Sequence, residues 1–255
     1  MWSWSRRALV WAAVIPLALL VTWDAPRLAG DAEPSRPRAA ERILPPVQQQ
    51  APAPAVVTRD SWGADEDLRT EAVTYTGAAR AVFIHHTNHP DDYDCADAPE
   101  MLKSMQADHV TRMGWDDVGY NFVVDKCGTI YEGRGGGYQR YVMGAHTTGF
   151  NGDSVGIAAL GDFLAGESVP DALITGIAQV AAWKLRPGAD PRGHVRMVST
   201  NDASRVPEGE EADLAVISGH RDIVETHCPG DALNAELPRI REETARLRVA
   251  SARKQ

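Results

Sequence analysis

The sequence predicts a single α/β domain, and three observations support this fold class. Short apolar runs typical of buried strands recur along the chain, beginning with AVFIHH at Ala81. Segments with apolar residues at helical spacing separate these runs, an alternation expected of a layered α/β structure. The stretch from Thr58 to about Ala250 shows no internal repeat and has the length of one domain.

Four short segments are predicted as strands. Ala81 begins AVFIHH, which ends at two histidines, and Tyr120 begins YNFVVD. Ser154 begins SVGIAAL, and Ala215 begins AVIS, which is a fourth strand or its edge. Apolar runs of this length are typical of buried strands. The acidic segment MVSTNDASRVPEGEE, residues 197–211, is predicted as a surface loop that could rim a cleft.

Three helices are predicted around these strands. Asp97 can cap a helix that runs to about Met113. Asp171 can cap a second helix and Asp231 a third, which Pro238 is expected to bend or split. The apolar stripe of the first helix consists of Leu102, Met105, His109 and Met113.

The N-terminal region has the layout of an export signal. Arg6 and Arg7 precede an apolar run from Ala8 to Trp23. Because this run is short for a membrane span, it is compatible both with a cleaved signal and with an anchor. Residues 1–30 are therefore predicted as a signal peptide or an N-terminal membrane anchor, with residues 8–23 as the possible tether.

The rest of the chain divides by composition into a linker and a domain. Residues 31–57 are rich in proline, alanine and glutamine and are predicted as a flexible linker. Residues 58–250 form the predicted domain, which is expected outside the cytoplasm, secreted or anchored at the outer face of the membrane. The net charge of −9 argues against a nucleic-acid partner, and we expect a monomer.

The number of cysteines is informative if the domain lies outside the cytoplasm. The chain has three cysteines, Cys95, Cys127 and Cys228, and in an oxidising compartment two of them should pair. Cys95 and Cys127 enclose a predicted helix and strand, and a bridge between them would stabilise the fold by about 3–4 kcal/mol. Cys228 would then be unpaired, and a bound metal is one way to occupy its thiol.

The segment GHRDIVETHCPG, from Gly219, suggests such a metal site. A catalytic zinc takes three protein ligands and leaves one position open for water. His220 and Cys228 can supply two ligands, and His85 is the best candidate for the third because it ends a buried strand. His86 would point to the opposite face of that strand. On spacing alone, a structural histidine and a surface loop without metal remain alternatives.

Five segments occur in an order that resembles one known family. They are TRDSWGA from Thr58, VFIHHT from Val82, GWDDVGYNFVVDKCGTIYEGRGGG from Gly114, GAHTTGFNGDSVGIAALGDF from Gly144 and GHRDIVETHCPG from Gly219. Together they resemble the peptidoglycan recognition proteins and the phage-lysozyme-type zinc amidases, which are N-acetylmuramoyl-L-alanine amidases. The resemblance covers about residues 58–241 and implies a central mixed β-sheet flanked by α-helices.

The resemblance also implies roles for particular residues. The family's zinc ligands fall on His85, His220 and Cys228. Its helper tyrosine falls on Tyr120, and a further catalytic position, lysine in the phage-type enzymes and commonly threonine in the recognition proteins, falls on Thr226. A family disulfide matches Cys95 and Cys127. Residues in matched segments that are expected to contact substrate are Trp115, Glu132, Arg134, His146 and Thr147.

The activity that the resemblance implies is hydrolysis, with Zn²⁺ as cofactor, of the amide bond between N-acetylmuramic acid and L-alanine. The expected partner is peptidoglycan or its muropeptide fragments. One alternative is a module that binds peptidoglycan without cutting it, and another is a structural protein with a disulfide and no metal. Family members that lack the cysteine ligand are not catalytic, so the presence of Cys228 favours the enzyme.

Overall fold

The computed structural model describes residues 50–253. The predicted signal or anchor and most of the predicted linker lie outside the described residues. Residues 50–57 of that linker contact the domain, since Ala51 N donates to Ala182 O at 3.1 Å and Val57 N donates to Ile130 O at 2.8 Å. Within the described part of the chain, no helix is both long enough and apolar enough to cross a bilayer.

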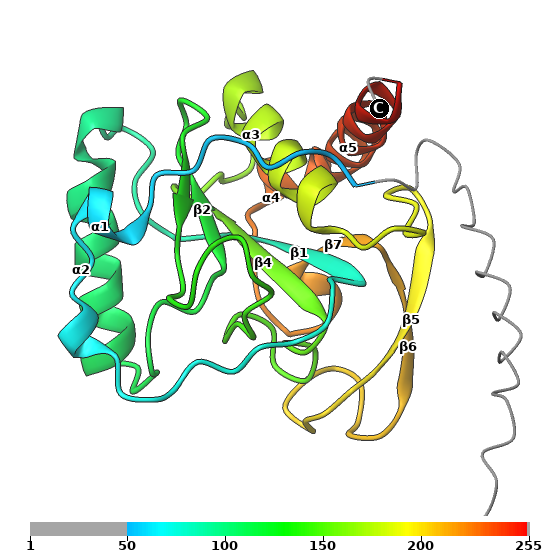
Figure 1. Ribbon diagram of the computed structural model, residues 1–255, viewed down its shortest axis with the longest axis horizontal. Helices are drawn as coiled ribbons and strands as arrows, with labels where there is room; N and C mark the ends of the chain where they lie inside the picture. The colour runs from blue at the N-terminus through cyan, green and yellow to red at the C-terminus, as the bar shows by residue number, and fades with distance from the viewer. Residues whose placement is uncertain (1–49, 254–255) are drawn as a thin grey trace, which may run out of the picture. The chain divides into compact units, whose positions relative to one another are not determined.

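A five-stranded mixed sheet forms the centre of the domain, as predicted (Figure 1). Its strands are β1 (Ala81–His86), β2 (Phe122–Val124), β3 (Ile130–Glu132), β4 (Ser154–Ala159) and β7 (Ile217–Gly219). The order is β3-β2-β4-β1-β7, and only the β2–β3 pair among these neighbours is antiparallel. The short antiparallel strand β3 is absent from the sequence prediction.

Helices cover both faces of this sheet (Figure 1). On one face lie α3 and α5, whose apolar residues join those of the central strands in the largest core cluster. On the other face α1 and α2 pack over β2, β3 and the end of β4. The helices are α1 (Arg59–Trp62), α2 (Ala98–Thr111), α3 (Asp171–Lys184), α4 (Asp231–Ala235) and α5 (Leu237–Ala252). Short 3₁₀ turns are η2 (Glu66–Leu68), η3 (Cys95–Asp97) and η4 (His220–Asp222).

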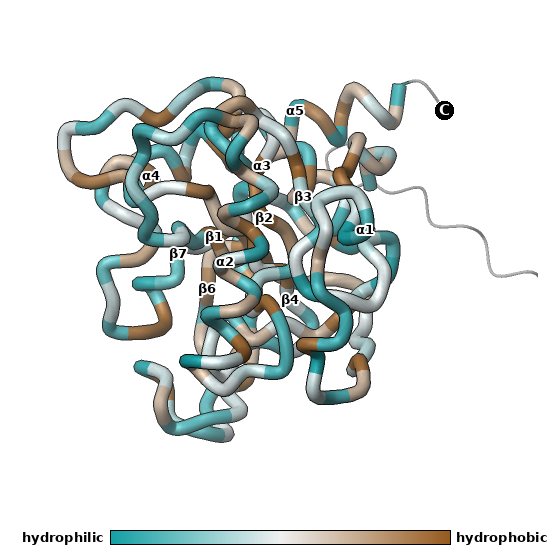
Figure 2. The backbone as a smooth tube through the Cα atoms, turned by 90° about the vertical axis from the view of Figure 1, so that its left-hand side faces the viewer, coloured by the Kyte–Doolittle hydropathy of each residue, from teal (hydrophilic) through white to brown (hydrophobic). Residues whose placement is uncertain are grey.

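The alternation of side chains along β1 determines where its histidines lie. Val82 and Ile84 belong to the cluster with α3 and α5, whereas Phe83 belongs to the cluster on the opposite face. Because successive strand residues point to opposite faces, His85 shares the face of Phe83. Figure 2 shows hydrophobic chain along these central strands and mostly hydrophilic chain in the outer turns.

The surface loop predicted at residues 197–211 is present at residues 199–210, and two strands that the sequence did not predict flank it and form a second sheet. Strand β5 (His194–Val198) pairs antiparallel with β6 (Glu211–Ala215). One side of this hairpin is buried against Phe83 and Phe150 through Met197, Ala212 and Leu214. The other side is exposed and polar except for Val198, so these strands lack the continuous apolar run that identified the central strands.

Two predicted helices differ from the structure in their details. Helix α2 ends at Thr111, and Met113 lies beyond it with a 45% exposed side chain, so it does not extend the buried stripe. The last predicted helix is split into α4 and α5 at Glu236, two residues before Pro238, as expected. The structure also contains the Cys95–Cys127 disulfide, which confirms that prediction.

Candidate metal centre

Three side chains predicted as metal ligands converge at the carboxyl ends of two neighbouring parallel strands. His85 lies near the end of β1, and His220 follows β7 directly as the first residue of η4. The loop after η4 brings Cys228 back to the same place. One potential ligand atom from each of the three residues lies within 4.8 Å of the others. His85 and Cys228 are 143 positions apart in the sequence. The pairing of β1 with β7 brings their segments together.

The donor atoms face one another in a protected environment. The Nδ1 atom of His85 is 3.6 Å from Cys228 Sγ, and the ring centres of His85 and His220 are 4.5 Å apart. His85 is 1% exposed and Cys228 is 7% exposed. Burial lowers the pKa of His85 well below its ordinary value and lowers that of His220 to about 4. Both imidazoles are therefore neutral at pH 7, which leaves a lone pair for a metal ion.

The surroundings of Cys228 act on its thiol in opposite directions. Burial raises the pKa of this thiol to about 12, and the His86 N–H and the charge of Arg221 oppose the rise. The His86 N–H donates to Sγ at 3.4 Å, a contact that favours the thiolate. The positive charge of a bound metal ion would stabilise the thiolate further, because a coordinated thiol loses its proton.

Arg221 holds the loop that carries Cys228. Its backbone N–H donates to Cys228 O at 3.0 Å, and its guanidinium also donates to His227 O. The same guanidinium forms an ion pair with Asp231 at 2.7 Å. Within the loop, Cys228 N donates to Thr226 Oγ1 at 3.2 Å. These contacts place Thr226, a predicted catalytic residue, immediately beside the candidate ligand.

Tyr120, the other predicted catalytic residue, also lies beside His85. The ring centres of Tyr120 and His85 are 5.2 Å apart, and the Tyr120 hydroxyl donates to His86 O at 3.3 Å. Burial, followed by the proximity of Cys228, raises the pKa of the phenol above its ordinary value. Tyr120 is therefore a protonated hydrogen-bond donor beside the candidate metal centre.

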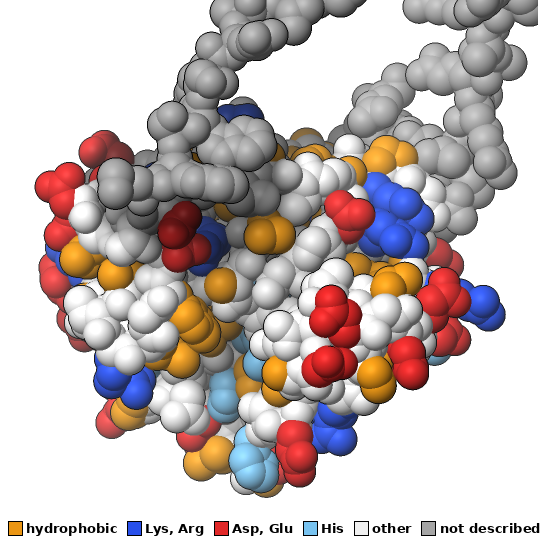
Figure 3. All heavy atoms as spheres, turned by 90° about the horizontal axis from the view of Figure 1, so that it is seen from below, with side chains coloured by type: hydrophobic (Ala, Val, Ile, Leu, Met, Phe, Trp, Pro, Cys, Tyr) orange, Lys and Arg blue, Asp and Glu red, His pale blue; other side chains and the backbone are white. Residues whose placement is uncertain are grey.

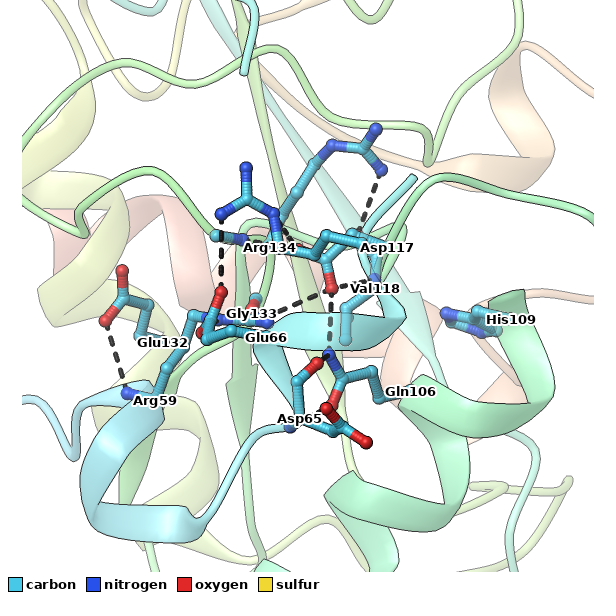
Figure 4. Close-up of polar contacts among 12 residues, drawn as sticks. Arg59, Asp65, Glu66, Gln106, His109, Asp117, Val118, Glu132, Gly133 and Arg134 are labelled. Carbon is cyan, nitrogen blue, oxygen red and sulfur yellow. Dashed lines mark hydrogen bonds and ion pairs between the residues drawn. The ribbon is translucent and has the colours of Figure 1, made fainter. Parts of the chain in front are cut away.

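Glu132 belongs to a buried polar cluster below α1 (Figure 4). Its carboxylate accepts the backbone N–H of Arg59 at 3.3 Å, and its backbone oxygen accepts Trp62 Nε1–H at 2.8 Å. Arg59 in turn donates to Asp117 at 3.3 Å. These contacts hold α1 against β3. The predicted role of Glu132 in substrate binding stays a prediction.

Arg134 and Trp115 are less buried than Glu132. The Arg134 guanidinium pairs with the Asp116 carboxylate at 3.0 Å and donates to Val118 O at 3.2 Å, as Figure 4 shows in part. The ring of Trp115 packs on His109, with ring centres 4.7 Å apart. Both side chains are partly open to solvent, so the structure leaves them available to a ligand.

His146 and Thr147, predicted as substrate contacts, are buried behind His85. They are 5% and 0% exposed. Their polar side-chain atoms lie within 3.3 Å of His85 Nε2, on the side of the ring away from Cys228. Burial lowers the pKa of His146 to about 3, so its imidazole is neutral.

Small residues on β4 make room for this arrangement, and they are absent from the sequence-based prediction of the site. In the β1–β4 register, Gly156 lies beside Phe83 and Ala158 beside His85. Parallel partners in register share a face, so the face that carries His85 has only small side chains on β4. The alternation of small residues with Val155 and Ile157 in SVGIAA was the available signal.

The candidate site lies between two lobes on one face of the sheet. One lobe is the cluster below α1 and α2, and the other is the cluster below the β5–β6 hairpin. Viewed from below, histidine side chains gather in a hollow between two bulging parts of the surface (Figure 3). His220, Tyr120 and Thr226 are each partly exposed. A substrate can therefore reach the site although His85 itself is buried.

The donor set fits a zinc ion. Two neutral imidazoles and a thiol are nitrogen and sulfur ligands of the kind that zinc prefers, and three is the usual number in a catalytic site. Among the described residues, one other group of potential ligands lies equally close, namely Cys95, Asp125 and Cys127. A disulfide joins its two cysteines, which removes their thiolates as ligands.

Comparison with known proteins identifies the family. A family model described as N-acetylmuramoyl-L-alanine amidase matches residues 75–231, more than half of the chain. The chain belongs to this family. Its relatives carry two kinds of name, amidase and peptidoglycan-recognition protein, which confirms the resemblance stated from the sequence.

Two relatives illustrate the similarity in sequence. Peptidoglycan-recognition protein SC2 of Drosophila simulans is 32% identical over 176 residues, covering 69% of this chain and 80% of the relative. The N-acetylmuramoyl-L-alanine amidase of Homo sapiens is 32% identical over 190 residues, covering 71% of this chain. The match spans only 27% of that human protein.

Two solved structures show the same fold. Drosophila PGRP-LB has a TM-score of 0.54 at 27% identity, covering 72% of this chain and 92% of that one. Peptidoglycan recognition protein-LE, in complex with tracheal cytotoxin, has a TM-score of 0.56 at 25% identity. The latter match covers 72% of this chain and 93% of that one.

Proposed function

We propose that the chain is a zinc-dependent N-acetylmuramoyl-L-alanine amidase that acts on peptidoglycan or muropeptides outside the cytoplasm. One observation carries this proposal: potential ligand atoms of His85, His220 and Cys228 converge within 4.8 Å. The family membership supports it, because relatives are named as amidases. The amide between N-acetylmuramic acid and L-alanine is the bond that this name specifies.

His85, His220 and Cys228 would hold the zinc ion, and the residues around them would act on the substrate. A bound zinc supplies Lewis acidity, which polarises a carbonyl group and makes water more acidic. The Tyr120 hydroxyl donates to His86 O at 3.3 Å in this structure. It can rotate toward a substrate and stabilise negative charge on the oxygen of the substrate carbonyl group. The raised pKa of Tyr120 keeps this donor protonated at neutral pH.

Thr226 and Arg134 have further roles in the proposal. The Thr226 hydroxyl accepts Cys228 N–H at 3.2 Å, and a hydroxyl that accepts one hydrogen bond can donate another to the substrate. Arg134 could bind a carboxylate of the stem peptide as a bidentate donor. The stem-peptide carboxylate would then replace the Asp116 carboxylate, which lies 3.0 Å from Arg134, or bind the guanidinium together with it. Trp115, whose partly exposed ring packs on His109, would offer an apolar surface to the substrate.

A module that binds peptidoglycan without cutting it is the second candidate function. The names of the recognition proteins among the relatives support binding, and a solved relative holds tracheal cytotoxin. The complete donor set, Cys228 included, favours hydrolysis over binding alone. The N-terminal tether and the monomeric state stay predictions.

Metal analysis together with a cleavage assay tests the proposal. The full chain, produced in an oxidising compartment, should contain one zinc ion per molecule. On purified peptidoglycan it should release stem peptides with a free L-alanine amino terminus, detected by mass spectrometry. Cys228→Ser should lose both zinc and cleavage. His227→Ala, an exposed neighbour outside the donor set, serves as the matched control and should keep both.

Each outcome of this test decides between the candidates. Zinc without cleavage, with retained binding to peptidoglycan, would replace the amidase by the binding module. Absence of zinc from both the wild type and the control would refute the metal centre and the mechanism built on it.

A further inference from the structure

The environment of His85 differs on the two sides of its ring. Its Nδ1 atom faces Cys228 Sγ at 3.6 Å, on the side where the candidate ligands converge. Its Nε2 atom faces away from them, toward His146 Nδ1 at 3.2 Å and Thr147 Oγ1 at 3.3 Å. Thr147 Oγ1 and His146 Nδ1 are themselves 2.9 Å apart. Three polar groups therefore form one small hydrogen-bonded unit behind the ring.

Two glycines form a slot that fits the His146 ring. A Cβ atom on Gly156 would lie 2.3 Å from His146 Cγ, and one on Gly144 would lie 2.4 Å from His146 Cδ2. Both distances are far shorter than any non-bonded carbon contact, so a side chain at either position would collide with the imidazole. The His146 ring can stay in this position only because both residues are glycine.

The backbone that carries His146 is fixed as well. The side-chain oxygen of Asn151 accepts the N–H of His146 at 2.9 Å and the N–H of Thr147 at 2.8 Å. Asn151 therefore fixes both residues through one acceptor. These hydrogen bonds fix the backbone from which the His146 ring projects toward His85.

The direction of the hydrogen bonds follows from the use of His85 as a ligand. A neutral imidazole that offers its Nδ1 lone pair to a metal carries its proton on Nε2. The groups facing His85 Nε2 must then accept this proton, either directly at His146 Nδ1 or through the Thr147 hydroxyl. When the bond is direct, or when the Thr147 hydroxyl accepts from His85 and donates in turn to His146 Nδ1 at 2.9 Å, His146 accepts at Nδ1 and carries its own proton on Nε2. Ligand histidines usually have an acceptor at their second nitrogen.

We propose that His146, with Thr147, is a positioning residue of the metal centre, which accepts the Nε2 proton of His85 and thereby presents His85 Nδ1 to the metal. This inference rests on the proposed zinc site and assigns His146 and Thr147 a role in it. Their burial supports the assignment. Among the described atoms, His146 Nε2 has no hydrogen-bond partner, and the hydrogen bonds that the structure shows for this ring are made at Nδ1.

Nitrogen-15 NMR of the histidine rings tests the inference directly in the zinc-loaded full chain. Two-bond correlations distinguish the two neutral tautomers of each imidazole. His85 is expected with its proton on Nε2 and metal at Nδ1, and His146 with its proton on Nε2 and a free Nδ1. A proton on His146 Nδ1, or metal at His85 Nε2, would overturn the proposal even if every variant failed to fold.

Zinc affinity of variants provides the second test. His146→Leu removes the acceptor and should weaken zinc binding by about 10- to 100-fold, measured by competition with a chromophoric chelator. His146→Asn places an amide oxygen near the position of Nδ1 and should restore affinity to within a few-fold of the wild type. His109→Leu is the matched control, since it removes another buried imidazole, on α2, and should leave zinc affinity unchanged.

The outcomes separate this inference from the proposed function. A wild-type chain that binds no zinc refutes the metal centre itself. A wild-type chain that binds zinc, together with a folded His146→Leu variant of equal affinity, refutes only the positioning role. Equal losses in His146→Leu and His146→Asn would show that the ring fills space and does not act as an acceptor.

Discussion

Exchange of Gly156 for alanine should disturb the slot in which the His146 ring lies. The added methyl group would lie 2.3 Å from His146 Cγ. Strand β4 cannot easily shift to relieve this collision, because Gly156 N–H donates to the Asn121 side chain at 2.9 Å and Gly156 O accepts Asn121 N–H at 3.0 Å. Overpacking of a buried site typically costs about 1–3 kcal/mol, and we expect a loss in this range.

Urea unfolding of the metal-free chain, with its disulfide intact, measures this loss. Gly152→Ala is the matched control, because a methyl group there meets no atom within 4 Å. At an unstrained position such an exchange changes stability by less than about 1 kcal/mol. The loss in Gly156→Ala should therefore exceed the effect of the control, and zinc affinity should fall with it.

A double-mutant cycle isolates the contact between the methyl group and the ring. In a His146→Ala background the ring is gone, so Gly156→Ala should be nearly neutral. The coupling between the two sites should then be about 1–3 kcal/mol, well above the deviation of about 0.5 kcal/mol that independent sites show. Additive effects of the two exchanges would refute the slot, as would equal effects of the Gly156 and Gly152 exchanges.

Three further predictions concern stability. Replacement of Cys95 and Cys127 by alanine should lower the unfolding free energy by about 3–4 kcal/mol for this 32-residue separation, measured in urea, with zinc affinity unchanged. Zinc at 100 times its dissociation constant should stabilise the chain by about 2.7 kcal/mol, and calorimetry should show no such gain for Cys228→Ser. Burial lowers the pKa of His109 from 6.5 to about 4, so the unfolded chain binds a proton in this range and the folded chain does not. Stability should therefore fall by up to about 3 kcal/mol as the pH drops through this window, and His109→Leu should flatten this dependence in unfolding experiments.

The sequence revealed the strands that are buried on both faces. AVFIHH and SVGIAAL are nearly continuous apolar runs because helices or loops cover each side of β1 and β4. Strand β3 has only three residues, and the β5–β6 hairpin exposes one side to solvent. Neither β3 nor the hairpin has the apolar run by which a buried strand is recognised in a sequence. These strands can therefore be identified only from the way they pack in the structure.

The sequence also placed His85 at the end of a strand but could not bring His220 and Cys228 to it. That convergence depends on the pairing of β1 with β7, and no periodic pattern states which strands are neighbours. The ligand set proposed from the residues therefore remained one alternative among others, and the resemblance to a known family supported the same set. The same resemblance predicted His146 as a substrate contact, and that role stays a prediction beside the positioning role that we propose.

The hairpin that the sequence did not predict connects the two segments beside His85. Residues 199–210 leave β5 and return as β6, and on the way Thr200 N donates to Gly149 O at 2.9 Å. In the same segment Arg205 N donates to Ile223 O at 2.7 Å. Gly149 follows His146 and Thr147, and Ile223 follows the turn that carries His220. The hairpin thus contacts both the segment that supports His85 and the segment that supplies a second candidate ligand. The candidate metal centre is thus supported by residues that carry no metal-binding chemistry, and motifs that identify the ligands do not identify these supporting residues.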